Sequence, residues 1–160
     1  MAASDLSATD LHWLREAIAQ SRLAAEAGHQ PYGAVLVSPE GARLWSAHNT
    51  QGRPEDVTGH AELNLVRQAA ECLGPHTLQG ATVYASGEPC PMCAGALYWS
   101  GVARVVFALD VHDMRALHGA ASVLPLRCHE VLAGATRTVA VAGPALQDEA
   151  RAAVARQRAT

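Results

Sequence analysis

The sequence predicts an α/β sandwich with parallel strand pairs in its sheet. Short apolar runs of β-rich composition recur along the chain, and segments with helical periodicity alternate with them. The connections between these segments are short, and glycine or proline marks most of the breaks. Because a strand–helix–strand unit with short connections lays its two strands side by side in parallel, this alternation favours an α/β fold.

The first element is a predicted helix over Asp10–Ala27. Its apolar residues recur three and four positions apart, beginning with Leu11 and Leu14. Asp10 is a suitable N-cap because its carboxylate can accept a hydrogen bond from the backbone N–H groups of the first turn. Gly28 ends the periodic pattern, as a glycine after the last helical residue commonly does.

Two short strands follow and are expected to form a β-hairpin. The run Tyr32–Val37 (YGAVLV) is apolar throughout, and Ala42–His48 returns after a Pro-Glu-Gly turn. A polar loop over Gly52–Gly59 then leads to a second predicted helix, His60–Cys72, which a Gly-Pro pair terminates.

The second half of the chain continues the alternation. The predicted strands are Ala81–Ser86 (ATVYAS), Ala103–Leu109 (ARVVFAL) and Thr136–Ala142, and the predicted helices are Pro89–Ser100, Asp113–Ala121 and Ala145–Arg158. No internal repeat or linker interrupts this series. We therefore expect one domain over residues 1–160, a length sufficient to bury a single core.

Composition and charge bear on the partners of the protein. Hydrophobic residues make up 49% and charged residues 17% of the chain, which is typical of a globular protein. No run approaches 18 apolar residues, so no membrane span is expected. The net charge is −3, there is no lysine, and only Arg151, Arg156 and Arg158 form a loose basic cluster. Proteins that follow nucleic-acid phosphates normally present a basic surface, so tRNA is a disfavoured partner.

The cysteines and the N-terminus indicate a compartment. The N-terminal MAASDLSATD lacks the basic and apolar regions of a signal peptide. Four cysteines allow disulfides, but Cys90 and Cys93 are only three residues apart and a domain of this size needs no disulfide to fold. We expect a reducing, cytoplasmic setting in which Cys72 and Cys128 are buried thiols.

The stretch PCPMC (residues 89–93) has the spacing of a metal site. If a helix begins here, the Cys90 and Cys93 side chains project from its first turn onto one face. Pro89 is tolerated at such a start, and the helix N-terminus favours the thiolate form that metals bind. Structural zinc requires four protein ligands, whereas catalytic zinc keeps three and an open position for water. With a single C-x-x-C in the chain, the pattern favours the catalytic arrangement.

The stretch HAELNLVR (residues 60–67) can complete this site. His60 is the best candidate for the third zinc ligand because the preceding loop allows it to stand at a helix start. In a first turn, Glu62 can reach the same point without binding the metal. A carboxylate beside the water in the open position can act first as general base and then as general acid.

Two other interpretations of these residues remain open. A C-x-x-C pair alone is also typical of a redox dithiol, but that interpretation leaves the HAE motif without a role. A structural zinc module or a catalytically silent, partner-binding subunit would need a fourth protein ligand, for which Cys72 and Cys128 are the candidates. In that case Glu62 would have no task.

The combination H-x-E followed by P-C-x-x-C is the signature of zinc deaminases. On PYGAVLV, SAHNT, HAELNLVRQA and YASGEPCPMCAGALYWSGVARVVF, the chain resembles the cytidine deaminase-like superfamily, in particular its guanine deaminase and tRNA adenosine deaminase branches. This resemblance implies a three-layer α/β/α sandwich with a five-stranded mixed sheet and one Zn²⁺ per active site. It implies His60, Cys90 and Cys93 as ligands, Glu62 as proton shuttle, and hydrolysis of an exocyclic amine to a carbonyl with release of ammonia.

The resemblance also points to substrate-binding residues. Asn49 matches an asparagine that contacts the base, although a turn asparagine is the alternative from the residues alone. Asp113 falls where guanine deaminases carry a substrate-binding or proton-shuttling aspartate, and it is equally suited to cap the following helix. Asn64 is an uncommon polar residue that faces either the pocket or solvent.

Only the resemblance ranks the possible substrates. ECLG and EPCPMC followed by GALYW are nearer to guanine deaminases, whereas HGAAS (residues 118–122) resembles the tRNA branch, and Gly87 stands where guanine deaminases carry a cysteine or a larger residue. We expect guanine or a related aminated purine first, then tRNA adenosine, then cytosine or a heterocycle such as a triazine or pterin. The family also implies assembly as dimers or tetramers, and we expect a homodimer.

Overall fold

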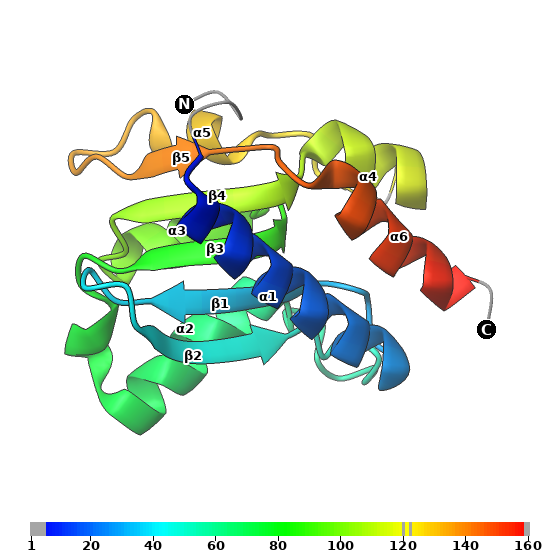
Figure 1. Cartoon of the computed structure of the whole chain (residues 1–160), viewed down its shortest axis with the longest axis horizontal. Coiled ribbons are helices and arrows are strands. Elements are labelled where there is room, and N and C mark those ends of the chain that lie inside the picture. Colours follow the sequence, from blue (N-terminus) through cyan, green and yellow to red (C-terminus); the bar gives the residue numbers. More distant parts are fainter. Residues whose placement is uncertain (1–5, 120, 122, 159–160) are drawn as a thin grey trace.

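The protein is an α/β structure built on one five-stranded mixed sheet, seen here in a computed structural model that describes residues 6–119, 121 and 123–158 (Figure 1). The strand order is β2-β1-β3-β4-β5. The strands are β1 (Gly33–Val37), β2 (Arg43–His48), β3 (Thr82–Gly87), β4 (Arg104–Leu109) and β5 (Ala140–Ala142). The predicted fold class is confirmed.

The strand directions bring three chain segments together at one end of the sheet. β1 is antiparallel to both β2 and β3, whereas β3, β4 and β5 are parallel. In these registers Gly33 at the start of β1 lies opposite His48 at the end of β2, and Ala34 lies opposite Ala85 near the end of β3. The carboxyl ends of β2 and β3 therefore meet the amino end of β1. In parallel sheets, ligand sites usually form beyond such carboxyl ends.

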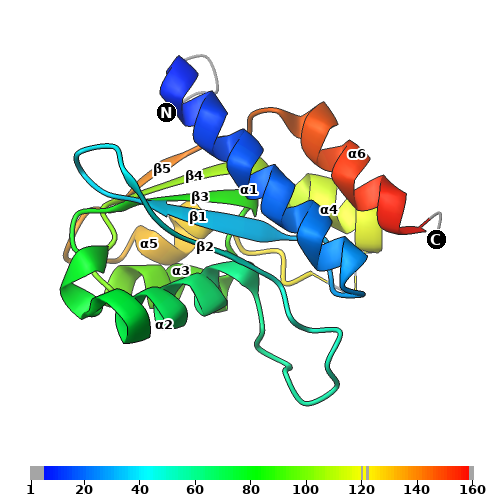
Figure 2. The same cartoon turned by 60° about the horizontal axis from the view of Figure 1, so that its bottom comes forward.

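Helices cover both faces of the sheet and complete three layers (Figure 2). On one face lie α1 (Ala8–Glu26) and α6 (Gln147–Arg158), and on the other lie α2 (Ala61–Leu73), α3 (Pro91–Trp99) and α5 (Cys128–Leu132). The short helix α4 (Val111–His118) follows β4 beyond the end of the sheet.

Side chains alternate between these layers along each central strand. On β1, Ala34 and Leu36 are buried against α2 and α3, whereas Val35 and Val37 are buried against α1 and α6. All five residues of β1 are buried, which is why this strand reads as a continuous apolar run and not as an alternating one.

Two predicted helix caps are wrong, and both errors have the same cause. Ser7 is the N-cap of α1, and Asp10 stands three residues later, where its carboxylate accepts a hydrogen bond from the Ser7 backbone N–H (2.9 Å). Asp110 is the N-cap of α4, and its side chain accepts a hydrogen bond from the Asp113 backbone N–H (2.9 Å). Each predicted cap belongs to the first helical turn, where an acidic residue is also favoured by the helix dipole.

Some predicted boundaries differ from the structure. The 3₁₀ helix η2 (Pro75–Leu78) and α5 were not expected, because a four- or five-residue helix shows no periodic pattern in the sequence. β5 is shorter than predicted, and α4 ends at His118, while residues 120 and 122 lie outside the description. Gly119 ends α4 because its φ of 91° is accessible mainly to glycine.

The cysteines and the helices bear on two further expectations. Cys128 is buried as predicted, but Cys72 is exposed at the end of α2, so the prediction for Cys72 is wrong. Across the part of the chain that the structure describes, the helices are all too short or too polar to cross a membrane.

Candidate active site

A cavity of about 790 Å³ opens where the three strand ends meet. It brings together residues from four segments that are distant in the sequence. Asn49 comes from the residue after β2, Glu62 from α2, Gly87 from the end of β3, and His118 from the end of α4. His60 and Cys90 line the same cavity.

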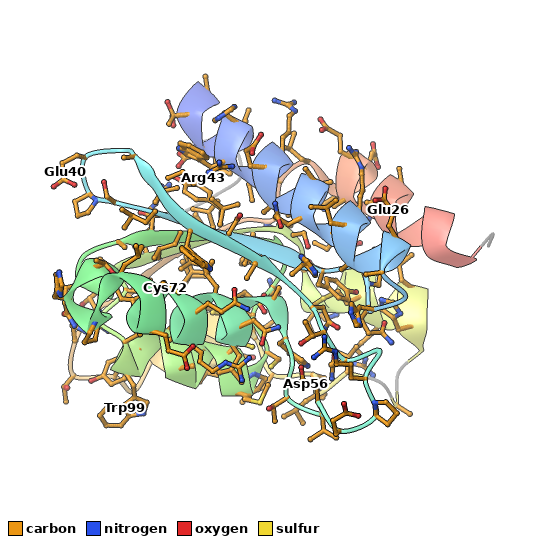
Figure 3. All side chains as sticks on the ribbon, turned by 90° about the horizontal axis from the view of Figure 1, so that it is seen from below. Glu26, Glu40, Arg43, Asp56, Cys72 and Trp99 are labelled. Carbon is orange, nitrogen blue, oxygen red and sulfur yellow. The ribbon has the colours of Figure 1, made fainter. Side chains whose placement is uncertain are left out.

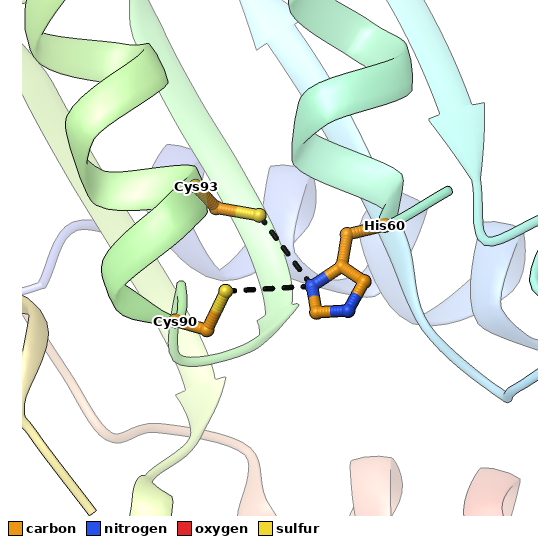
Figure 4. Close-up of side chains that lie close together, drawn as sticks. All are labelled: His60, Cys90 and Cys93. Carbon is orange, nitrogen blue, oxygen red and sulfur yellow. Dashed lines mark hydrogen bonds between the residues drawn. The ribbon is translucent and has the colours of Figure 1, made fainter. Parts of the chain in front are cut away.

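His60 and Cys90 both stand at helix starts. His60 is the N-cap of α2, and its extended backbone (φ −70°, ψ 150°) turns the imidazole away from the helix. Cys90 is the N-cap of α3, Pro91 occupies the first helical position, and Cys93 lies in the first turn, fully buried. The helix therefore begins two residues later than predicted, and the two sulfurs still share one side of its start (Figure 4).

The three side chains form a group with the dimensions of a zinc site. Nδ1 of His60 lies 3.5 Å from Sγ of Cys90 and 3.6 Å from Sγ of Cys93 (Figure 4). Zinc bonds of about 2.3 Å to sulfur and about 2.0 Å to nitrogen, at the tetrahedral angle, place those two atoms about 3.5 Å apart. The donor set and its spacing therefore fit a zinc ion without rearrangement.

No further cysteine joins this group among the residues that the structure describes. Among the described His, Cys, Asp and Glu side chains, His60, Cys90 and Cys93 are close enough to share an ion, with their donor atoms within 4.8 Å of one another. Cys72 and Cys128 are outside the group. The structural-zinc interpretation thus lacks the fourth protein ligand that it requires.

Glu62 lies beside the group although it is two residues from His60. It occupies the second position of α2 and is only 6% exposed. Burial raises the pKa of Glu62 to about 7, against the opposing effect of the His60 imidazole. Its carboxylate is close enough to Cys93 for a hydrogen bond from that thiol. A carboxylate with this pKa is suited to exchange protons near neutral pH.

The pKa of the Cys90 thiol is lowered in this cluster. It falls to about 4 because Cys93 and His60 donate hydrogen bonds to its thiolate, and these outweigh the opposing effect of burial. A depressed pKa supplies the deprotonated sulfur that metals bind.

Asn49 lies in the cavity and is held by a neighbour that sequence reasoning missed. Nδ2 of Asn49 donates to Oε1 of Gln51 (2.8 Å), and the Gln51 backbone N–H donates to Oδ1 of Asn49 (2.8 Å). Gln51 lines the cavity as well, and its side chain donates to the Val57 carbonyl (3.1 Å). The cavity thus holds two carboxamides in fixed orientation. The spacing Asn-x-Gln in a polar loop is too common to single out Gln51 beforehand.

The structure does not bring Asn64 or Asp113 into the cavity lining. Nδ2 of Asn64 is buried and donates to Oγ1 of Thr50 (2.9 Å) and to the His48 carbonyl (3.0 Å), so this side chain ties α2 to the segment that carries Asn49. Asp113 forms an ion pair with Arg151 of α6, and thus joins α4 to the last helix.

Tyr32, Gly87 and His118 also line the cavity. Tyr32 precedes β1 and reaches the site because β1 runs antiparallel to β3. The only sequence signal was the hairpin prediction, which fixes the direction of β1 relative to β2 but not its neighbour on the other side.

The comparisons with known proteins agree with this geometry. The family described as the cytidine and deoxycytidylate deaminase zinc-binding region matches residues 7–109. A probable cytosine deaminase of Schizosaccharomyces pombe is 36% identical over 154 residues, which are 94% of this chain and 93% of that protein. A tRNA-specific adenosine deaminase of Bacillus subtilis is 43% identical over 95 residues, 59% of this chain and 58% of that relative.

A solved structure extends the similarity. The guanine deaminase of Bacillus subtilis is 34% identical, with a TM-score of 0.64, and the match covers 70% of this chain and 71% of that one. The residues matched to the family span His60, Glu62, Cys90 and Cys93. The chain therefore belongs to the cytidine and deoxycytidylate deaminase family of zinc-binding deaminases.

Proposed function

We propose that the protein is a zinc-dependent hydrolytic deaminase that converts an exocyclic amine of a nucleobase to a carbonyl and releases ammonia. His60, Cys90 and Cys93 are the proposed ligands of one Zn²⁺, and Glu62 is the proposed proton carrier. The observation that carries this proposal is the buried Glu62 carboxylate, which lies in the same cavity as a three-donor group of zinc dimensions.

The protein residues around this centre have separate tasks. Bound zinc supplies a Lewis acid that lowers the pKa of water enough to yield a nucleophile near neutral pH. The Glu62 carboxylate accepts a proton from that water and donates it to the ring nitrogen beside the reacting carbon. A second proton transfer to the leaving amine completes the exchange of NH₂ for oxygen. The carboxamides of Asn49 and Gln51 are the proposed hydrogen-bond partners of the ring edge, because both residues line the cavity.

The proposed substrate is a small heterocycle, with guanine or a related aminated purine first. Of the described residues that line the cavity, none is arginine, and the chain contains no lysine. An RNA substrate requires cations for its phosphates, so the proposal disfavours tRNA as a partner. The similarity to a guanine deaminase supports a purine, and the paired carboxamides offer both donors and acceptors to its edge.

Cytosine is the second candidate. The relative that spans nearly the whole chain is named a probable cytosine deaminase. The guanine deaminase match covers a smaller share of this chain.

We also propose that the protein is a cytoplasmic homodimer. Trp99 at the end of α3 is 84% exposed and projects away from the protein (Figure 3), and Met92 on the same helix is 37% exposed. Large exposed apolar side chains mark contact surfaces, and a second copy is the proposed partner here. A reducing compartment keeps the Cys90 and Cys93 thiols available for a metal.

An ammonia-release screen tests these proposals. The zinc-loaded protein is assayed with guanine, 2,6-diaminopurine, adenine and cytosine, with the corresponding nucleosides, and with a tRNA anticodon stem-loop. Ammonia from guanine or another aminated purine supports the first candidate, and ammonia from cytosine alone supports the second. Activity on the stem-loop only contradicts the small-molecule proposal.

A further inference from the structure

One wall of the cavity is formed by an aromatic ring that packs directly on a glycine. A Cβ placed on Gly87 would lie 2.9 Å from Cε1 of Tyr32 and 2.9 Å from Sδ of Met114. Carbon atoms in optimal contact are about 3.5–4.0 Å apart, so the ring occupies the space that a side chain at this position would take. Gly87 ends β3 and stands three residues before Cys90. The ring is therefore a fixed boundary close to the proposed zinc centre.

Tyr32 is held in this position from both ends. Its backbone carbonyl accepts a hydrogen bond from the Asn49 backbone N–H (3.0 Å), and its own N–H donates to the Gln30 carbonyl (2.8 Å). At the far end of the side chain, Oη of Tyr32 lies 2.6 Å from Nε2 of His118. Because His118 is the last residue of α4, this contact joins the start of β1 to the end of that helix.

Other parts of the cavity lining are exposed and apolar. Val57 from the loop before α2 is 75% exposed, and Leu124 is 65% exposed, although both line the cavity. These two side chains are free to adapt to a bound molecule, whereas the Tyr32 ring is held in place.

We propose that Tyr32, held by His118 and seated on Gly87, sets the size limit of the substrate and selects free heterocyclic bases over their nucleosides. This inference rests on the proposed deaminase function. A nucleoside carries a ribose in addition to the base, and a wall fixed at both ends cannot retreat to admit it. One methylene in a hydrophobic pocket changes discrimination by about 10- to 200-fold, so a preference of at least about tenfold is expected against the larger ribose.

The test compares base and nucleoside in the same variants. The pairs are guanine and guanosine, adenine and adenosine, and cytosine and cytidine, and kcat/KM is measured for each with zinc-loaded protein. The proteins are the wild type, Tyr32→Ala, Tyr32→Phe, His118→Ala, and the double variant that carries both Tyr32→Phe and His118→Ala. Tyr32→Ala is expected to lower the preference for the base by about tenfold or more, through a lower KM for the nucleoside. His112→Ala, an exposed histidine of α4 outside the cavity, is the control and is expected to leave the preference unchanged.

The two milder variants test the hydrogen bond itself. Tyr32→Phe and His118→Ala each remove the contact between Oη and Nε2, so each is expected to reduce the preference by less than Tyr32→Ala does. The combined variant is expected to change the preference by less than the sum of the two single effects, because both remove the same hydrogen bond. If the effects of Tyr32→Phe and His118→Ala on the preference for the base simply add, the proposed role of the hydrogen bond is overturned. If Tyr32→Ala fails to fold, His118→Ala still tests the inference, because it keeps the Tyr32 ring.

The outcomes separate this inference from the proposed function. If the wild type deaminates free bases and every variant keeps the same preference, the inference is overturned and the proposed function stands. If the wild type releases no ammonia from any base, the proposed function fails. Equilibrium dialysis of the same bases and nucleosides then tests the role of Tyr32. The inference is supported if the wild type binds the nucleoside more weakly than the base and Tyr32→Ala removes this difference. It is overturned if the wild type binds both equally.

Discussion

Glu88 and Arg127 form an ion pair, with Oε2 of Glu88 lying 2.9 Å from Nε of Arg127. The Glu88 side chain is 1% exposed, and its carboxylate also accepts hydrogen bonds from the backbone N–H groups of Cys128 (2.9 Å) and Val111 (3.0 Å). One carboxylate thereby joins the residue after β3 to the starts of α4 and α5. Because Cys90 follows two residues later, this network holds the segment that carries a proposed zinc ligand.

Glu88→Gln is expected to destabilise the protein by about 2 kcal/mol, since hydrogen bonds to charged groups contribute about 1.5–3 kcal/mol each. The substitution also leaves the Arg127 guanidinium without its partner. Urea unfolding measures the change. Glu149→Gln breaks the exposed ion pair with Arg15 and serves as the control, with an expected loss below about 0.5 kcal/mol. Equal losses in both variants would show that the Glu88 network does not stabilise the fold.

Much of the fold could be predicted because its signals are local. The five strands and the long helices were expected from apolar runs and helical periodicity, and each has a counterpart in the structure. The errors lie at residues whose surroundings are determined by contacts with distant parts of the sequence. Asp10, for example, reads as a cap but is drawn into the interior by Arg104 and Tyr84, which are far away in the sequence.

The site shows the same division between local and distant signals. His60, Glu62, Cys90 and Cys93 were predicted from motifs, because metal chemistry restricts residue type and spacing. Tyr32 and Gln51 were not, since hydroxyl and carboxamide side chains enter a cavity only through the pairing of strands, which the sequence does not state. Asp113 was chosen by resemblance, and Asn64 because it is an uncommon polar residue in its helix. Both stay predictions as substrate contacts, although both lie outside the cavity lining.

Glu62→Gln is expected to retain about one zinc per chain and to lose deamination by about 10²- to 10⁴-fold, the usual contribution of a general acid–base. The amide keeps the shape of the side chain but cannot carry the proton. Metal analysis and ammonia release are measured on the same preparation. Cys93→Ser is the counterpart and is expected to lose zinc together with activity. Substantial activity in metal-replete Glu62→Gln would remove Glu62 from the mechanism.

Trp99→Ser is expected to shift the protein from dimer to monomer, because it removes the largest exposed apolar side chain of α3. Sedimentation at several protein concentrations measures the change. Val57→Ser alters a side chain that is similarly exposed, at 75%, but lies on a loop, and it is expected to leave the dimer intact. A wild type that stays monomeric at all concentrations contradicts the proposed assembly.

The stability of the protein is expected to depend on Asp10 in acid. Burial raises the pKa of Asp10, but hydrogen bonds from Arg104, Ser7 and Tyr84 outweigh it and hold the pKa well below its ordinary value of 3.8. The unfolded chain therefore binds this proton more readily than the folded protein does. The stabilisation is complete above about pH 4 and is lost as the pH falls further, toward the lowered pKa of the folded state.

Asp10→Asn tests this dependence, because it removes the charge but keeps the size of the side chain. At pH 7 the variant is expected to be less stable than the wild type by about 1.5 kcal/mol or more, and the difference is expected to shrink in unfolding experiments below pH 4. Asp148→Asn, whose side chain is 99% exposed, is the control and is expected to show little difference at either pH. If the free energy of unfolding of Asp10→Asn differed from that of the wild type by the same amount at all pH values, the lowered pKa of Asp10 would be contradicted.

Two glycine substitutions are expected to act in opposite directions. Gly33 tests how closely α1 packs on the sheet, and Gly95 in α3 is the comparison. A Cβ at Gly33 would lie 2.4 Å from the Ala17 carbonyl oxygen and 2.5 Å from the Ser21 backbone nitrogen, atoms that cannot move without displacing α1. Gly33→Ala is therefore expected to destabilise the protein by about 1–3 kcal/mol. A Cβ at Gly95 in α3 meets open space, so Gly95→Ala is expected to stabilise it by about 0.5–1 kcal/mol. Thermal unfolding of both variants measures the difference, and a tolerated Gly33→Ala would show that α1 can shift away from β1.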